Sequence, residues 1–183
     1  FDRATARLSR RPLIAMERFG LSPLIRLTLL SLYLALVFPL PLLAPEELRL
    51  WMVLVLVLGL VLVVGLLSEQ VEIDDAGIQV RYPMWIRWLL RRGWSMPWGD
   101  VRALVPVGTS QGGTVYYLKS ADLRHQLLPQ RIEQFDRFLQ ILSERTSVTT
   151  DGVGRLTPPW TYQMLAALSL LMLIGELIVL VRM

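Results

Sequence analysis

Cysteine is absent from the 183 residues, and histidine and lysine occur once each, at His125 and Lys119. The lack of cysteine excludes disulfide bonds, thiolate metal sites and cysteine nucleophiles. A lone histidine without a second ligand at helical spacing argues against a transition-metal site, and His125 reads as a strand residue beside a turn. These shortages point away from redox and metal chemistry.

Other catalytic patterns are also missing from the sequence. Gly112 and Gly113 are not followed by the lysine and serine or threonine that complete a phosphate-binding loop. Asp74 and Asp75 stand between two alternating segments, where acidic residues are ordinary turn formers. We therefore predict that the protein is not an enzyme, with no catalytic, cofactor-binding or metal-binding residues and no small-molecule substrate.

Charged residues are scarce, at 19%, whereas 54% of the residues are hydrophobic. The hydrophobic excess gathers in three blocks, at residues 27–44, 50–67 and 161–181. A helix needs about 20 mainly apolar residues to cross the hydrocarbon core of a bilayer. The blocks predict a transmembrane helical hairpin over residues 27–67 and a third transmembrane helix within residues 158–183. Pro39 and Pro41 predict a bend or helix end near Phe38, followed by a tight turn.

Arginines predict the orientation of these helices. Six of them precede the first block, against two acidic residues: Arg3, Arg7, Arg10, Arg11, Arg18 and Arg26. Short segments rich in arginine stay on the cytoplasmic side. We expect a multi-pass membrane protein whose basic N-terminal segment (1–26) and central domain are cytoplasmic, with the C-terminus outside. The membrane would be a bacterial inner membrane, or a thylakoid with the domain on its stromal or cytoplasmic side.

The central domain, residues 68–157, shows strand patterns followed by a helical one. Alternation at 71–73 and 78–82 around an acidic turn predicts a hairpin. Further strands are expected at 101–107, 114–119 and 125–128. Apolar spacing of three and four between Ile132 and Leu142 predicts an amphipathic helix that closes a small antiparallel sheet. Between Glu69 and Arg155 the chain has eleven basic and ten acidic residues, a balance that excludes nucleic acid as a partner.

Three strings in this region are similar to bacterial pleckstrin-homology-like domains found beside membrane helices. They are the hairpin VEIDDAGIQVRY, the segment Met96-Pro97-Trp98-Gly99-Asp100-Val101 that enters a strand, and LLPQRIEQFDRFLQIL at the end. The resemblance covers residues 68–147. It implies a β-rich scaffold or interaction domain closed by a C-terminal helix, rather than an enzyme.

A weaker resemblance connects the chain with the photosystem I assembly proteins of cyanobacteria and plastids. The shared features are the hairpin of residues 27–67, Arg91-Arg92-Gly93, Asp100-Val101-Arg102 and the helix near 131–145. The third apolar block departs from that pattern. The resemblance implies a role in assembling a photosynthetic membrane complex.

Residues 82–98 form an insert rich in tryptophan and arginine. It contains four of the six tryptophans of the chain. Both residue types are suited to the bilayer interface, where arginine meets phosphates, but both are also frequent at protein–protein contacts. A third reading places Trp94 and Trp98 in the core of the sheet. The residues predicted to contact the membrane interface or a partner are Trp85, Arg87, Trp88, Arg91, Arg92 and Trp94.

Glu176 is the acidic residue within the third apolar block. Carboxylates inside a membrane are costly and are often functional. Its position near the end of the block favours a side chain that reaches the headgroups. Contact with another subunit, or proton or ion handling, are the alternatives.

The sequence as a whole favours a non-enzymatic accessory or assembly subunit of a larger membrane complex. Its partners would be other membrane protein subunits and the lipid bilayer. The alternative is a scaffold or lipid-sensing protein that acts at the membrane surface through the tryptophan- and arginine-rich insert.

Overall fold

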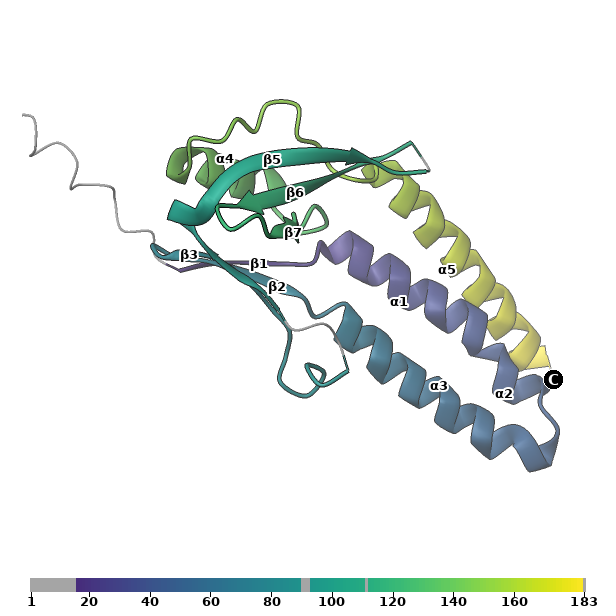
Figure 1. The fold of residues 1–183 in the computed structure, drawn as a ribbon. Helices are drawn as coiled ribbons and strands as arrows, with labels where there is room; N and C mark the ends of the chain where they lie inside the picture. Colours follow the sequence, from purple (N-terminus) through teal and green to yellow (C-terminus); the bar gives the residue numbers. More distant parts are fainter. Residues whose placement is uncertain (1–15, 90–92, 111, 183) are drawn as a thin grey trace, which may run out of the picture.

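Long apolar helices lie side by side, with a β-rich domain at one end of them (Figure 1). The structure is a computed structural model that describes residues 16–89, 93–110 and 112–182. The helices are α1 (Pro23–Val37), continued by the short α2 (Pro39–Leu43), then α3 (Glu46–Leu66) and α5 (Pro159–Arg182). In the described part of the chain, three helical stretches are long and apolar enough to cross a membrane, as the sequence predicted. The predicted bend near Phe38 is also confirmed, because α1 ends at Val37.

Small and polar side chains make the contacts between the helices. Thr28 of α1 is fully buried, and its hydroxyl lies within hydrogen-bond distance of the carbonyls of Leu24 (2.8 Å) and of Tyr162 in α5 (3.1 Å), between which it shares its one proton. The Tyr33 hydroxyl donates to the carbonyl of Leu56 in α3 (2.7 Å). A Cβ at Gly59 would overlap that same hydroxyl, so the absence of a side chain there allows α1 and α3 to approach.

A four-stranded antiparallel sheet has the order β1-β2-β3-β4. Its strands are β1 (Glu17–Gly20), β2 (Gln70–Ile73), β3 (Gly77–Arg81) and β4 (Ser95–Pro97). The β2–β3 hairpin confirms the prediction from its alternating pattern. β1 was not predicted: it precedes α1 yet pairs with β2, which follows α3. The helical hairpin is therefore an insertion between two neighbouring strands, and both of its ends are fixed to one sheet.

The second sheet and a helix complete the domain. A 3₁₀ turn (Trp98–Asp100) leads into β5 (Val101–Gly108), which pairs with β6 (Thr114–Ser120), and β6 pairs with β7 (His125–Leu127). Helix α4 (Phe135–Arg145) follows. These elements confirm the predicted strands and the predicted amphipathic helix, although α4 begins later than residue 131. The backbone of Gln134 is left-handed, with φ 49°, and Ile132 forms a bridge with Leu21, so the helix cannot begin earlier.

The core lies between the two sheets and α4. The inward residues Phe135, Phe138, Ile141 and Leu142 of α4 are no more than 1% exposed. They meet strand residues that are equally buried: Val71, Ile73, Ile78 and Leu118.

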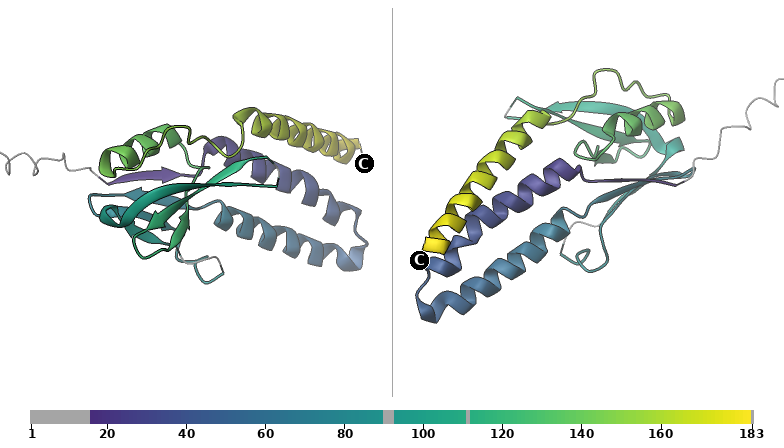
Figure 2. Two further views of the ribbon diagram at one scale, coloured as in Figure 1. Left: turned by 45° about the horizontal axis from the view of Figure 1, so that its top comes forward. Right: turned by 180° about the vertical axis from the view of Figure 1, so that it is seen from behind.

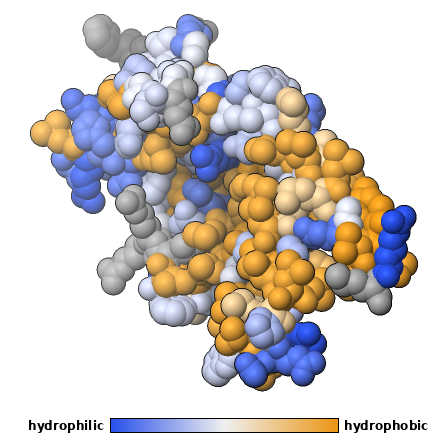
Figure 3. Space-filling view, turned by 90° about the vertical axis from the view of Figure 1, so that its right-hand side faces the viewer, coloured by the Kyte–Doolittle hydropathy of each residue, from blue (hydrophilic) through white to orange (hydrophobic). Residues whose placement is uncertain are grey.

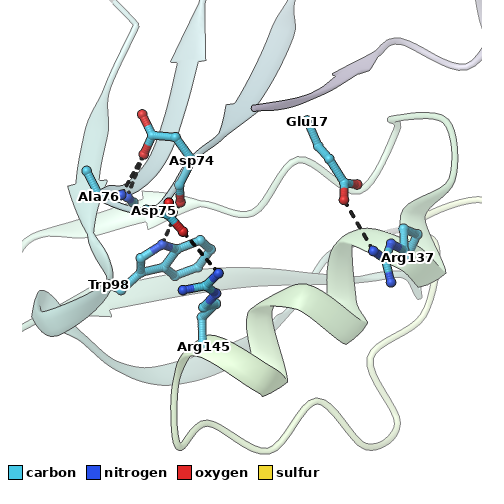
Figure 4. Close-up of polar contacts among 8 residues, drawn as sticks. Glu17, Asp74, Asp75, Ala76, Trp98, Arg137 and Arg145 are labelled. Carbon is cyan, nitrogen blue, oxygen red and sulfur yellow. Dashed lines mark hydrogen bonds and ion pairs between the residues drawn. The ribbon is translucent and has the colours of Figure 1, made fainter. Parts of the chain in front are cut away.

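Ion pairs hold both ends of α4 against the four-stranded sheet (Figure 4). Arg137 pairs with Glu17 of β1 (3.2 Å), and Arg145 pairs with Asp75 in the β2–β3 turn (3.1 Å).

Apolar side chains cover the outside of the helices, as the hydrophobic surface in Figure 3 shows. In the most apolar stretches of α3 and α5, 6% of the residues are buried. The two further views in Figure 2 show that the domain lies at one end of the helices and that the C-terminus lies at the other, near the α2–α3 turn. A surface of this kind is typical of helices that face lipid or other helices.

Candidate membrane-facing insert and junction cleft

The tryptophan- and arginine-rich insert leaves the sheet at the end of β3 and folds into successive turns. The Pro83 carbonyl accepts hydrogen bonds from the backbone N–H groups of Ile86 and Arg87, both at 3.2 Å. The Trp88 indole N–H donates to the Trp85 carbonyl (2.9 Å). Arg91 and Arg92 lie outside the described residues. Figure 1 shows the insert as a loop beside the end of α3 that adjoins the domain.

One side chain fixes the insert to α3. Ile86 is 2% exposed and fits against Gly65, in the last turn of α3. A Cβ on Gly65 would overlap Ile86 and come within 2.8 Å of the Trp85 ring. Glycine at this position therefore lets the insert lie directly on the helix. The insert is thereby placed at the level where α3 meets the domain.

The remaining apolar side chains of the insert are partly or largely exposed, although the Trp85 ring also lies against Gly65. Met84 and Trp88 are each 81% exposed, and Trp85 and Leu89 are about half exposed. Arg87 is exposed beside them. Large apolar residues that are mixed with arginine next to an apolar helix end fit the bilayer interface, where tryptophan is enriched.

Trp94 and Trp98 lie elsewhere. Trp98 is part of the core, and its indole N–H donates to the Asp74 carbonyl (2.9 Å; Figure 4). Trp94 is partly buried against that core, and its carbonyl accepts from the Val80 N–H (2.8 Å). The structure therefore separates Trp94 from Trp85 and Trp88, with which the sequence had grouped it, and supports the core reading for Trp94 and Trp98.

A buried carboxylate on the four-stranded sheet had no signal in the sequence. The Glu72 side chain is 10% exposed and pairs with Arg18 of β1 (3.1 Å) and Arg81 of β3 (3.3 Å). Arg18 is its direct cross-strand neighbour. The two arginines neutralise the carboxylate across three adjacent strands, and they attach β1 to the sheet. We interpret this group as structural.

A cleft of about 320 Å³ lies where α1 and α3 meet the domain. We call it the junction cleft. Its polar wall carries Arg26, Ser68, Glu69, Gln70 and Glu133. Its apolar wall is formed by Leu21, Pro23, Leu27 and Leu30. No local sequence pattern marks this site, because its residues come from three separate segments of the chain, 20–30, 68–70 and 133.

Glu69 is a half-buried acid of the junction cleft. Burial raises the pKa of its carboxyl above the usual value, and this outweighs a hydrogen bond from Tyr82 and the positive charge of Arg131, both of which act to lower it. The Arg26 guanidinium, on the same polar wall, donates to the Leu67 carbonyl at 3.3 Å. Within the described residues, no ion pair joins Arg26 to Glu69 or Glu133.

Glu176 lies in the second half of α5. One of its carboxylate oxygens is buried and has no hydrogen-bond partner among the described residues. His125 is exposed in β7. Across residues 16–89, 93–110 and 112–182, no group of three or more histidine or acidic side chains is arranged to hold a metal ion.

Comparison with known proteins gives one informative match. The chain is 44% identical over 160 residues to the uncharacterized protein slr0269 of the cyanobacterium Synechocystis. The aligned region covers 84% of this chain and 80% of the relative. The chain belongs to the slr0269 family. Because so much of the chain is aligned, the family relationship extends beyond the β-rich domain into the apolar helices. No family model matches the chain, and no solved structure matches it.

Proposed function

We propose that this member of the slr0269 family is a non-enzymatic membrane protein that acts as an accessory or assembly subunit of a larger membrane complex. Its three apolar helices cross the bilayer, and its domain and N-terminal segment lie on the cytoplasmic side. The domain serves as a pleckstrin-homology-like interaction module. The cyanobacterial source of the relative makes photosynthetic complexes the first partners to test.

The observation that carries this proposal is the firm connection between the domain and a largely uncovered helix bundle. β1 leads into α1 and α3 leads into β2, so the domain cannot move independently of the helical hairpin. Most apolar side chains of α3 and α5 face outward. Such a molecule can hold the domain at a fixed place over a partner whose helices pack against its own.

Photocrosslinking tests the proposed partner. A photoreactive phenylalanine analogue replaces Leu58 of α3 or Leu171 of α5, which are 68% and 65% exposed, and ordinary phenylalanine at the same positions is the control. We expect a discrete protein adduct after irradiation and purification in mild detergent. A solitary monomer that carries lipid adducts alone would contradict the proposal.

The orientation can be tested because the chain contains no cysteine. Single variants Glu47→Cys, at the start of α3, and Leu123→Cys, in the exposed turn before β7, are treated with a membrane-impermeant thiol reagent on intact cells. We expect labelling at residue 47, and labelling at residue 123 only after the membrane is opened. The reverse pattern would overturn the cytoplasmic placement of the domain.

A second candidate function, recognition of the membrane surface by the insert, is favoured by the exposed side chains of Met84, Trp85, Trp88 and Leu89. Because the helical hairpin interrupts the sheet, the test uses the full chain in lipid nanodiscs. Lipids brominated near the headgroup should quench tryptophan fluorescence, and Trp88→Phe should remove part of that quenching. The matched Trp98→Phe variant removes a core tryptophan and should leave the quenching in place. Equal effects of the two variants would reject this function.

A further inference from the structure

The junction cleft is placed where a membrane lipid would have its headgroup. It opens between the first half of α1, the connection from α3 to β2 and Glu133, which precedes α4. Leu27 and Leu30 extend its apolar wall along α1, and Leu27 is 64% exposed. Its volume of about 320 Å³ lies within the range of small-ligand sites, roughly 300–1,000 Å³. The cleft thus has a polar end at the domain and an apolar end along a membrane helix.

The charges of the cleft favour a neutral ligand. Arg26 and two acids, Glu69 and Glu133, line the cleft, and Arg131 adds a positive charge near Glu69. The net charge is therefore not positive, and an anionic phosphate gains little there. The absence of an ion pair between Arg26 and either acid, among the described residues, leaves space between the charged groups. A ligand with a charge of one sign would be attracted by some of these groups and repelled by the others.

Hydrogen-bond acceptors dominate the polar wall. The two carboxylates accept, Ser68 and Gln70 both accept and donate, and Arg26 is the one group in this wall that donates alone. Hydroxyl groups, which donate to carboxylates and accept from guanidinium, match such a wall.

We propose that the junction cleft binds a neutral membrane lipid whose headgroup carries several hydroxyl groups, as a sugar does. The headgroup lies between Arg26 and Glu133, and an acyl chain follows Leu27 and Leu30. This inference rests on the insertion of the helices in a bilayer, but it does not require the proposed protein partner. The bound lipid would fill the space where the helical hairpin joins the domain.

The test measures which lipids stay bound to the full chain. The protein is reconstituted in nanodiscs of phosphatidylcholine that contain equal fractions of a monogalactosyl diacylglycerol and of phosphatidylglycerol. It is then extracted in mild detergent, and the retained lipids are quantified by mass spectrometry. We expect about tenfold enrichment of the galactolipid, the change that the loss or gain of one charge-assisted hydrogen bond produces.

Paired variants separate the cleft from the rest of the surface. Glu133→Ala removes an acceptor from the cleft, and Leu27→Trp fills its apolar end. Each should lower the enrichment to near unity. The matched controls are Glu144→Ala, on the exposed face of α4, and Leu36→Trp, on the exposed side of α1 near its far end, and both should keep it. Thermal unfolding in the same detergent shows whether each variant is folded.

Several outcomes would overturn the proposal. Enrichment of phosphatidylglycerol that is lost in Arg26→Gln would identify an anion site instead, and equal retention of all lipids would show that the cleft is not selective. Full competition by soluble methyl galactoside would assign the cleft to a free sugar. Resistance of the protein to carbonate extraction is measured separately. A chain that is inserted in the membrane but retains all lipids equally would refute this inference alone. A chain that is not inserted would refute the proposed function as well.

Discussion

The domain and the helix bundle bury their apolar residues to opposite extents. Phe138 and Leu142 in the domain are fully buried, whereas Leu58 and Leu171 in the helices are about two-thirds exposed. The domain is stabilised by removing apolar surface from water, at roughly 25 cal/mol per Å². The helices meet one another through Thr28, Tyr33 and Gly59 instead. The same residue types therefore build a closed core in one region and an outward surface in the other, as the proposed placement of the helices in a bilayer would require.

The largest effect should come from opening the domain core. Phe138→Ala should lower the free energy of unfolding by about 3–5 kcal/mol, the usual cost of deleting a buried phenylalanine ring. Leu58→Ala, on the outward face of α3, is the control and should change it by less than about 0.5 kcal/mol. Denaturant unfolding in detergent, followed by tryptophan fluorescence, measures both. Similar losses for the two variants would break the contrast between the regions.

The next effect is expected where the two regions meet. Gly65→Ala should push Ile86 and Trp85 away from α3 and cost about 1–3 kcal/mol, as overpacking does. It should also raise the protease sensitivity of the insert. Gly175→Ala, in α5, has nothing within 4 Å of the added Cβ and is the matched control. An insert that stays protected in Gly65→Ala would show that Ile86 does not hold it.

A smaller effect should follow a change between the helices. Thr28→Val keeps the shape of the side chain but removes the hydrogen bond to the Tyr162 carbonyl. Interhelical hydrogen bonds in membranes contribute about 0.6 kcal/mol on average, so the α1–α5 contact should weaken slightly. Ser31→Ala, which loses a hydrogen bond within α1 alone, is the control. Hydrogen exchange at the start of α5 should increase in Thr28→Val and not in Ser31→Ala.

The smallest effect is a change in how strongly the unfolding temperature depends on pH, and it concerns Glu69 in the junction cleft. Because burial raises the pKa of Glu69, folding favours its protonated form. The stability that the protonated Glu69 contributes to the fold is fully present below the pKa of this group in the unfolded chain. It is lost as the pH rises through the pKa of Glu69 in the folded state. Glu69→Gln should therefore unfold at a higher temperature than the wild type above that window, with a flatter pH profile. A lower unfolding temperature for Glu69→Gln than for the wild type above that window would show that Arg131 and Tyr82 outweigh burial.

The sequence predicted the elements that carry their own local signal. The apolar blocks, the Val71–Tyr82 alternation and the Ile132–Leu142 spacing all became the expected helices, strands and amphipathic helix. Each pattern repeats over enough residues to be recognised without knowledge of the partner element.

The elements that were missed depend on contacts far apart in the chain. β1 is four residues long, contains two charged side chains, and gains its place by pairing with β2 and by the Arg18–Glu72 ion pair. The short strand β4 contains Pro97. The junction cleft combines the start of α1, the α3–β2 connection and Glu133. No local window contains such information, since burial across a fold depends on tertiary packing.

The pairing of β1 with β2 also constrains how the protein is made. β1 leaves the ribosome first but has no strand to pair with until α1, α2 and α3 have been synthesised. In the proposed membrane topology, failure of one of the two long helices to insert would leave β1 and β2 on opposite faces of the bilayer. The four-stranded sheet could then not close, and Phe19 would be left without its neighbours in the core. In that proposed topology the sheet can form only after both helices of the hairpin have inserted, and a half-inserted chain would expose an unfinished sheet to proteases.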